Sequence, residues 1–490
     1  MLRWVLFTAL LLLYWAARIP GLDVLPLHND EGLHLTRAVE VWNLHPFWMI
    51  SDGKIINHWP IALLYPQNAP AFVGRVPTLL LGMMGLAAGY EWVRSQFGLL
   101  ASVLAGSLWI TSPYLFFYER TALSDAEAGA LIVVTLWATA RLTNFPTMLR
   151  AVLVGLAFGA AVLFKFTAAP FALTIAALVL FERRHSLRLR LRLLATAGAV
   201  SALCFVVPVA YLLLRGQDLF AVALGWVSTG GAGDPAVSAN LVRLWDQLTG
   251  FGSVGWSLLM LAGLLLLALF ARRSDRILLL AVGLPLGVML VLGREVLPRH
   301  YVVALPVVLV LAGAGLGGAL APLDPPLLRR LATSTIILLL AGGGLPFALT
   351  AYRDPAGLPL PDAIRTQYIS EHSGGYGLRE AVLALPETLD QPELPVIASM
   401  FPDGCRRANF YAAPAAPRLT CGDAPGWPQI VAALDAHGGV YVMTDTAPLI
   451  GADILAEAPA FAAQAREIAR YPRPGETLES ASVVLWELTR

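Results

Sequence analysis

The sequence has little charge. Of its 490 residues, only 14% are Asp, Glu, Lys or Arg, whereas 57% are hydrophobic. Soluble domains carry about 25% charged residues, so the composition excludes an ordinary soluble protein. The net charge of +1 excludes a bulk electrostatic attraction to nucleic acid. Many uncharged runs approach the length that a bilayer requires, and we therefore expect a multi-pass membrane protein.

Cysteine and lysine are also scarce. Of three cysteines, Cys204 lies in an apolar run and is expected to be a small core residue, whereas Cys405 and Cys421 lie in the polar C-terminal part. A disulfide between these two requires an oxidising compartment, and the sequence leaves their pairing open. Only two of the 34 basic residues are lysines, Lys54 and Lys165. A lysine inside an apolar stretch is therefore conspicuous.

Apolar runs along the chain predict an all-α polytopic membrane bundle of about eleven transmembrane helices. If eleven spans are counted, the arginine-rich loops, including "RRHSLRLRLR", all fall on one side, which the positive-inside rule assigns to the cytoplasm. The N-terminus is then cytoplasmic and the C-terminus extracytoplasmic, at the inner or plasma membrane. The runs lie at about 4–17, 71–90, 97–118, 126–140, 149–164, 166–181, 193–214, 250–271, 277–293, 301–321 and 331–351.

Two soluble parts remain outside the membrane: the first loop, about 18–70, and the tail after residue 351. The tail alternates strand-like runs ("LPVIASM", "GGVYVMTD", "ASVVLWEL") with helical ones ("IVAALDAHG", "PAFAAQAREIARY"). This pattern predicts a transmembrane domain over 1–351 and an external α/β domain over 352–490.

Four polar motifs fall on the predicted external face. Asp30 and Glu31 open the first loop in "PLHNDEGLHL", and an interfacial helix, "EGLHLTRAVEVWNL", follows them. Ionisable groups at membrane depth are costly and usually functional. The other three motifs are "YERTALSD" (residues 118–125), Lys165 in "LFKFTAAP", and "REVLPRHY" (residues 294–301).

Each motif also has a purely structural interpretation. Asn29 or Asp30 would cap the first-loop helix, with acidic residues favoured in its first turn. Lys165 would extend its charged end to the lipid headgroups. The remaining structural interpretations are an interfacial ion pair for Arg120 and Asp125, a surface loop position for Arg299, and an aromatic belt for His300 and Tyr301.

Carboxylates and cations together at a membrane surface fit one kind of chemistry. A phosphate leaving group needs cations to take its developing charge, and a hydroxyl or amine nucleophile needs a base. A lipid-phosphate-linked sugar meets both needs. Asp30 would then deprotonate or orient the acceptor, while Lys165 and Arg299 would hold the phosphate.

The motifs resemble a known group of enzymes. "HNDEGLHLTRAVEVW", "YERTALSD", "GLAFGAAVLFKFTAAP", "PRHYVVALPVVLVLAG" and "SGGYGLRE" are similar, in this order, to motifs of the GT-C superfamily of polyprenyl-phosphate-sugar glycosyltransferases. The most similar branch contains the protein O-mannosyltransferases and the lipid A aminoarabinose transferases. The resemblance covers about residues 1–380.

The resemblance implies an inverting transfer that uses no nucleotide sugar. It implies a polyprenyl-phosphate-linked sugar as donor, membrane lipids as surroundings, and a lipid, a glycan or a protein as acceptor. It implies these residue roles: Asp30 as catalytic carboxylate, Glu31 and Asp125 at the acceptor or sugar site, Lys165, Arg299 and Arg120 at the lipid phosphate, and His300 and Tyr301 lining the same pocket.

No cofactor is expected, although a divalent metal stays open because some GT-C members need one. The sequence has no Asp-x-Asp motif, and His28, Asp30 and His34 form a zinc-like spacing without a fourth ligand.

Two other functions stay open. A transporter or flippase of lipid-linked sugars would carry charges near the membrane midplane and paired repeats. An oligosaccharide ligase or polymerase would use a large late external loop, which here offers mainly Asp218, Asp234 and Arg243.

Overall fold

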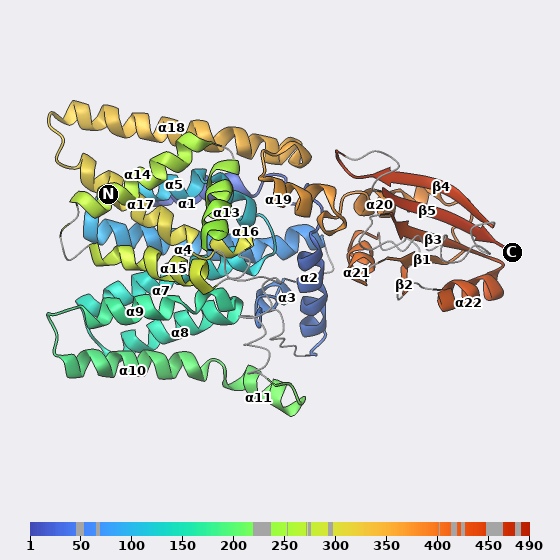
Figure 1. The fold of residues 1–490 in the computed structure, drawn as a ribbon, viewed down its shortest axis with the longest axis horizontal. Coiled ribbons are helices and arrows are strands. Elements are labelled where there is room, and N and C mark those ends of the chain that lie inside the picture. Colours follow the sequence, from blue (N-terminus) through green and yellow to red (C-terminus); the bar gives the residue numbers. More distant parts are fainter. Residues whose placement is uncertain are drawn as a thin grey trace. The chain divides into compact units, whose positions relative to one another are not determined.

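The computed structural model divides the chain into two compact units, which Figure 1 colours along the sequence. The helical unit comprises Met1–Leu22, His45–Ile61 and Arg75–Pro361, and the sheet unit comprises Asp23–Leu44, Ala62–Gly74 and Asp362–Arg490. The structure describes residues 1–45, 53–64, 69–218, 237–251, 253–270, 272, 276–292, 297–400, 402–412, 419–422, 427–446, 464–475 and 482–490.

Within these ranges, four helical segments are long and apolar enough to cross a membrane, and two bent helix pairs raise the number to six. Four further apolar helices are shorter. The eleven spans expected from the sequence therefore stay a prediction. The four long segments are Pro70–Phe97, Ser124–Asn144, Leu187–Leu214 and Pro326–Arg353, and the bent pairs are Leu99–Thr111 with Pro113–Glu119 and Val237–Gly250 with Val254–Phe270.

The helical unit holds, wholly or for most of their length, the helices of the apolar runs (Figure 1). They are α1 (Leu2–Arg18), α3 (Trp59–Ala62), α4 (Pro70–Phe97), α5 (Leu99–Thr111), α6 (Pro113–Glu119), α7 (Ser124–Asn144), α8 (Met148–Phe164), η1 (Phe166–Ala168), α9 (Phe171–Leu180), α10 (Leu187–Leu203), α11 (Val206–Leu214), α13 (Val237–Gly250), α14 (Val254–Phe270), η2 (Arg276–Leu279), α15 (Leu280–Leu292), α16 (Pro298–Tyr301), α17 (Leu305–Leu320), α18 (Pro326–Arg353) and η3 (Pro355–Gly357).

The core of this unit lies around α17, whose residues from Leu305 to Gly317 are all buried. Gly313 and Gly317, one helical turn apart, face the backbone of α5 at Ala105 and Ala101 so closely that a Cβ on either glycine would collide with it. Small residues of this kind let membrane helices approach each other, because dispersion contacts replace the hydrophobic effect as the driving force.

The sheet unit contains a five-stranded sheet of order β2-β1-β3-β5-β4 (Figure 1). β1 pairs parallel with β2 and β3, whereas β5 pairs antiparallel with β3 and β4. The elements are α2 (Asn29–Trp42), α19 (Asp362–Arg365), η4 (Thr366–Ser370), η5 (His372–Gly374), α20 (Leu378–Thr388), β1 (Val396–Ser399), α21 (Pro402–Tyr411), β2 (Leu419–Gly422), α22 (Trp427–His437), β3 (Gly439–Asp445), β4 (Ala465–Pro472) and β5 (Ser482–Thr489).

Helices cover both faces of the sheet. Leu378 and Leu385 of α20 and Ala408 of α21 pack on one face, which β1 lines with Val396 and Ala398. Ile430 of α22 packs on the other face, beside Ile397. The alternation of Val396, Ile397 and Ala398 between two cores is what the two-residue period of a strand produces. The α/β tail expected from the sequence is therefore present.

One expectation for the tail is wrong. The run "PAFAAQAREIARY" has the composition of a helix, but its described part forms β4, which pairs with β5. Ala, Glu and Arg are good helix formers, but intrinsic propensity contributes less than about 1 kcal/mol per residue and tertiary context often overrides it. Antiparallel pairing with β5, which is almost fully buried, satisfies the backbone and overrides that preference. Residues 459–463 of the run lie outside the described residues.

The sheet unit also contains the first-loop helix α2. Gly32 of α2 faces the side chain of Arg407 in α21 so closely that a Cβ would overlap it. The sequence divides the chain at residues 351 and 352, whereas the compact units group Asp23–Leu44 with the tail. A pattern along one chain does not reveal packing between segments about 370 residues apart.

Candidate active site

A buried ion pair joins two of the residues expected at the site. Lys165 Nζ lies 3.4 Å from Asp125 Oδ1, and the two side chains are 2% and 1% exposed. Asp125 stands in the first turn of α7 and Lys165 directly follows α8. Since α7 and α8 are consecutive helices, the start of the first and the end of the second meet at one end of the hairpin.

The chain around Lys165 is a fixed break between helices. Lys165 has extended backbone angles, with φ −157° and ψ 125°, between α8 and η1. A strand-like segment crosses this break: Ile55 N donates to Leu163 O at 2.9 Å, and Phe166 N donates to Gly53 O at 3.1 Å. The same segment contains Lys54, whose side chain is buried. Both lysines of the chain therefore lie at one helix break.

Further charges surround this pair. The pKa of His300 is lowered to about 3, first by burial and then by the nearby Lys165, with smaller effects of Arg299 and Lys54 in the same direction and an opposing effect of Asp125. These side chains are therefore within electrostatic range of one another. We call Lys54, Asp125, Lys165, Arg299 and His300 the charge cluster. His300 is neutral at physiological pH, so the cluster holds three cations and one carboxylate.

Tyr301 directly follows His300 of the cluster in sequence, but its hydroxyl bonds to the backbone of another helix. Its hydroxyl donates to Asn240 O at 2.9 Å, and Asn240 in turn donates to Leu290 O at 3.3 Å. This connects α16 to α13 and α15. Of the motif that contains these residues, positions 294–296 lie outside the described residues, as does Asp234 of the late external loop.

Neutral polar groups next to the cluster lack hydrogen-bond partners. Asn57, 1% exposed, has neither amide atom paired, and the hydroxyl of Ser124, 0% exposed, is likewise unpaired among the described residues. Buried polar groups are nearly always hydrogen-bonded. Such groups three residues after Lys54 and directly before Asp125 suit a polar ligand. Sequence patterns did not assign Lys54, Asn57 or Ser124 to the candidate site, although the scarcity of lysine in the chain was a signal for Lys54.

Arg120 has a different environment from the cluster. Its guanidinium donates to three carbonyl oxygens after α1: Arg18 O at 2.9 Å, Pro20 O at 2.7 Å and Gly21 O at 2.6 Å. The preceding residue, Glu119, forms a buried ion pair with Arg18 at 2.9 Å. These contacts fix the chain that leaves α1, which is a structural task. The structural alternative paired Arg120 with Asp125, whereas the structure pairs Asp125 with Lys165.

Asp30 and Glu31 lie at the start of α2 in the sheet unit. The expected cap residue was Asn29 or Asp30, but His28 caps the helix: its ring accepts from Asp30 N at 3.1 Å, and Glu31 Oε2 accepts from His28 N at 2.9 Å. This reciprocal capping box satisfies two helix-end donors. Glu31 is fully buried, whereas Asp30 is partly exposed.

One of the histidines near Asp30 has an aromatic packing partner. The ring of His28 stacks on Tyr368, with centroids 4.5 Å apart. Over the described part of the chain, no three His, Cys, Asp or Glu side chains gather in a group that could hold a metal ion.

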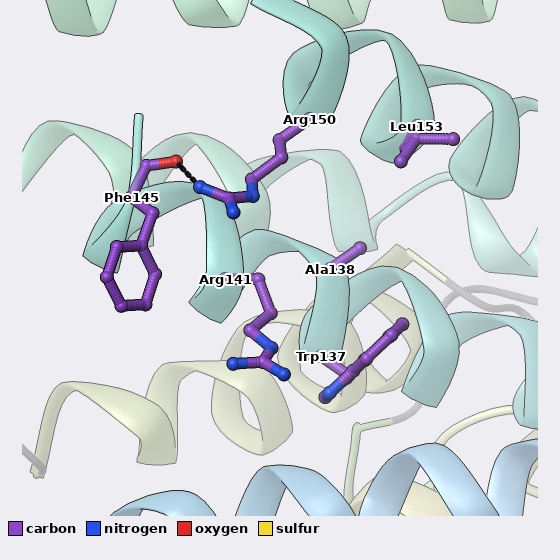
Figure 2. A pocket seen from close by; sticks show the side chains of 6 residues that line it. All are labelled: Trp137, Ala138, Arg141, Phe145, Arg150 and Leu153. Atoms are coloured by element: carbon purple, nitrogen blue, oxygen red, sulfur yellow. Dashed lines mark hydrogen bonds between the residues drawn. The ribbon is translucent and has the colours of Figure 1, made fainter. Parts of the chain in front are cut away.

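A separate cavity of about 430 Å³ lies at the opposite end of the α7–α8 hairpin. Figure 2 shows Arg141 and Arg150 there, with Trp137 and Phe145. Arg141 is sixteen residues after Asp125, which at 1.5 Å per residue is about 24 Å along the helix. The cavity is therefore distinct from the charge cluster.

Comparisons with known proteins agree with the expected resemblance. The family model for dolichyl-phosphate-mannose-protein mannosyltransferases matches residues 58–212. This range includes Asp125 and Lys165 but ends before Arg299. No curated protein matches the sequence.

Solved structures define the fold over nearly the whole chain. ArnT from Cupriavidus metallidurans bound to undecaprenyl phosphate has a TM-score of 0.62 at 17% identity, over 98% of this chain and 97% of ArnT. Its apo form has a TM-score of 0.61 at 18% identity over the same shares. The oligosaccharyltransferase from Archaeoglobus fulgidus in the apo form has a TM-score of 0.54 at 13% identity, over 91% of this chain and 69% of that protein.

These matches confirm the resemblance to the GT-C superfamily of polyprenyl-phosphate-dependent glycosyltransferases at the level of the fold. With its long apolar helices, the chain is a membrane protein whose fold is similar to that of ArnT.

Proposed function

We propose that this protein is an inverting membrane glycosyltransferase that moves a sugar from a polyprenyl-phosphate donor to an acceptor on the extracytoplasmic face. The observation that carries the proposal is the buried pair of Lys165 and Asp125 at a helix break, with Lys54, Arg299 and His300 within electrostatic range. Lysine, arginine and histidine side chains around one carboxylate suit an anionic ligand, and the GT-C fold supplies the chemical context.

In this proposal the cluster holds the leaving group. The acceptor oxygen or nitrogen attacks the anomeric carbon while the bond from that carbon to the phosphate oxygen breaks. The phosphate leaves with the bonding electron pair, and Lys54, Lys165 and Arg299 stabilise the charge that develops on it. The carboxylate of Asp125 keeps Lys165 in place and, with Ser124 beside it, contacts the sugar. His300 and Tyr301 line the pocket.

Asp30 takes the proton of the acceptor in the same step. Its carboxylate stands at the N-terminus of α2, where the helix dipole favours a negative charge, and an ionised carboxylate can accept a hydrogen bond from the nucleophile. Glu31 supports it: because Glu31 Oε2 closes the capping box with His28 N, its carboxylate helps to shape the acceptor site and fixes the helix start. Arg120 supports the site through its three carbonyl contacts.

The extracytoplasmic location has support from both units. Cys405 and Cys421 form a disulfide, and disulfides persist in oxidising compartments. The positive-inside rule favours a cytoplasmic location for the arginine-rich loops of the helical unit. The proposal therefore puts the N-terminus in the cytoplasm and the sheet unit outside the inner or plasma membrane.

The proposed donor class is supported by the ligands of the similar structures. ArnT was solved with undecaprenyl phosphate, and the Archaeoglobus oligosaccharyltransferase with dolichol-phosphate and an inhibitory peptide. A polyprenyl phosphate is their common ligand, so a polyprenyl-phosphate-linked sugar is the proposed donor. Lipid, glycan and protein hydroxyl or amine groups are the proposed acceptor classes, and a divalent metal is an open part of the proposal.

The test is sugar release from a panel of undecaprenyl-phosphate-linked sugars by the purified protein in lipid nanodiscs, with Asp30→Asn as variant. Asp30→Asn should lower turnover at least ~100-fold, as expected for loss of a general base, without lowering the unfolding temperature. Glu40→Gln is the matched control, because Glu40 lies on the same helix and is exposed. Wild-type turnover in Asp30→Asn would overturn the assignment of Asp30.

A further inference from the structure

The chain that leads into α2 is held by side chains from the C-terminal part of the sheet unit. We call residues 23–28 the lead-in loop. Arg407 Nη1 donates to Leu27 O at 3.1 Å, Leu27 N donates to the hydroxyl of Tyr411, and Arg379 donates to Val24 O. The backbone on both sides of Leu27 is thus bonded to residues about 380 positions later in the sequence.

Arg407 forms the centre of this arrangement. Its guanidinium also donates to Ser373 O at 2.9 Å and to His372 O at 2.7 Å, and the residue is 2% exposed. One planar cation therefore joins three carbonyl groups from two distant segments. A guanidinium offers five donors in a rigid fork, so lysine cannot reproduce the arrangement.

Two glycines allow these segments to approach. Gly375 has φ +80°, and a Cβ there would lie 2.6 Å from Leu27 O. Gly32, in the first turn of α2, lies against the side chain of Arg407, and no Cβ fits between them. The motif "SGGYGLRE" (residues 373–380) therefore has a structural role in this protein, because its Gly375 and Arg379 contact the lead-in loop.

The contact continues from Leu27 to Asp30 through one residue. His28 stacks on Tyr368 at 4.5 Å between ring centroids, and its ring accepts from Asp30 N at 3.1 Å. Arg407 holds Leu27, Leu27 fixes His28, and His28 fixes the backbone of Asp30. A shift of the lead-in loop would therefore be passed on to the carboxylate of Asp30.

From this geometry we propose that Arg407 is a positioning residue for Asp30, and that the C-terminal part of the chain is a component of the active site. The inference rests on the proposed function of Asp30. Arg407 does not touch the substrate. It fixes the lead-in loop, so that α2 presents Asp30 in one orientation, and a misplacement of about 1 Å is enough to lower a catalysed rate ~100-fold.

Arg406 provides a matched control, because it is the neighbouring residue of α21 and its side chain is exposed. The first measurement is hydrogen–deuterium exchange of residues 23–36 in the full-length protein in nanodiscs. Arg407→Ala should raise the exchange rate of these amides at least ~10-fold, whereas Arg406→Ala should leave it unchanged. Exchange in Arg407→Ala equal to that of the wild type would overturn the inference, whatever the enzyme activity.

The second measurement is steady-state transfer from the undecaprenyl-phosphate-linked sugar that the wild type uses. Arg407→Ala should lower kcat by ~10- to 100-fold while the donor KM changes less than about twofold, because the proposed phosphate ligands are untouched. Arg407→Lys should recover only part of kcat, since it can reach a single carbonyl. An unchanged kcat, or a rise in donor KM alone, would overturn the inference.

Tyr411→Phe removes only the hydroxyl that accepts from Leu27 N. This variant allows the same measurements to be made if Arg407→Ala does not fold. It should lower kcat by a smaller factor at an unchanged unfolding temperature, and wild-type kcat with unchanged exchange would again refute the inference. The failure of the proposed function gives a different pattern: no sugar transfer in the wild type, with the exchange difference between Arg407→Ala and Arg406→Ala intact.

Discussion

Lys165 Nζ lies 3.4 Å from Asp125 Oδ1, and neither side chain is more than 2% exposed. Burying two charges costs several kcal/mol per ion, which their attraction repays only in part. The pair therefore does not persist for stability alone. In the proposed function, this pair and the nearby Lys54 and Arg299 form the site that binds the donor phosphate.

The first prediction concerns the coupling of this pair. Asp125→Asn leaves Lys165 buried without its carboxylate and should lower the free energy of unfolding by about 3–5 kcal/mol. The double variant Asp125→Asn/Lys165→Met, which removes both charges, should recover at least about 1 kcal/mol of that loss. Urea unfolding in mild detergent measures both. Strictly additive losses would mean that the two side chains are not coupled.

The second prediction concerns the affinity for the donor phosphate. Lys165→Ala and Lys54→Ala should each weaken binding of undecaprenyl phosphate by about 10-fold or more, because a charge-assisted hydrogen bond contributes about 1.5–3 kcal/mol. Lys54→Ala leaves the pair of Lys165 and Asp125 intact, and it thus separates lost binding from lost folding. Native mass spectrometry with added lipid measures the affinity.

Arg120→Lys is the control for that experiment. A lysine cannot bond all three carbonyls that Arg120 contacts, so the variant should lower the unfolding temperature with little change in lipid affinity. A large loss of affinity in Arg120→Lys, with none in Lys54→Ala, would move the phosphate site from the charge cluster to Arg120.

The third prediction concerns pH and His300. Its pKa is about 3 in the folded protein and about 6.5 in an unfolded chain. Between pH 6.5 and pH 3, His300 is therefore protonated in the unfolded chain but not in the folded protein. The contribution of His300 to stability is complete above pH 6.5 and decreases progressively as the pH falls towards 3.

Between pH 7 and pH 5 this difference amounts to about 2 kcal/mol. His300→Gln should therefore lose less stability than the wild type over that interval, as measured by urea unfolding at both pH values. Equal pH dependence of the two proteins would show that His300 titrates normally, in which case the cations of the cluster do not surround it.

The fourth prediction concerns the disulfide of Cys405 and Cys421, which joins α21 to β2 across 16 residues. Closing a loop of this length stabilises a folded domain by about 3 kcal/mol in the chain-entropy account. The pair Cys405→Ser/Cys421→Ser should lower the unfolding free energy of the sheet unit by up to that amount, whereas Cys204→Ser, outside that unit, should not. A reducing agent should reproduce the loss in the wild type and in Cys204→Ser, but not in the double variant.

Secondary structure was predicted correctly from the sequence where the local residue pattern determines it. Runs with strand composition became β1, β3 and β5, and the helical run before β3 became α22. The first-loop helix formed as expected. β4 was not predicted, because its Ala-, Glu- and Arg-rich sequence favours a helix and only its pairing with β5 makes it a strand.

Part of the candidate site could be predicted from the types of residues in the sequence and their positions relative to the apolar runs. A lysine that ends an apolar run and an Asp in the first turn of another are visible in one chain, and the structure joins them. Lys54 was not assigned, because only the crossing of residues 53–56 over the break after α8 brings it there. Arg120 has the chemistry of a phosphate ligand, but nearby carbonyls occupy its donors.

The most direct test of the central claim is an electron cryomicroscopy structure of the full-length protein in nanodiscs with bound undecaprenyl phosphate. We predict phosphate density within about 3–4 Å of the Lys165 and Lys54 ammonium groups, with the Asp30 carboxylate facing it across no more than about one helix diameter, roughly 10 Å. Phosphate density away from both lysines, or an Asp30 side chain that points into bulk water, would contradict the account.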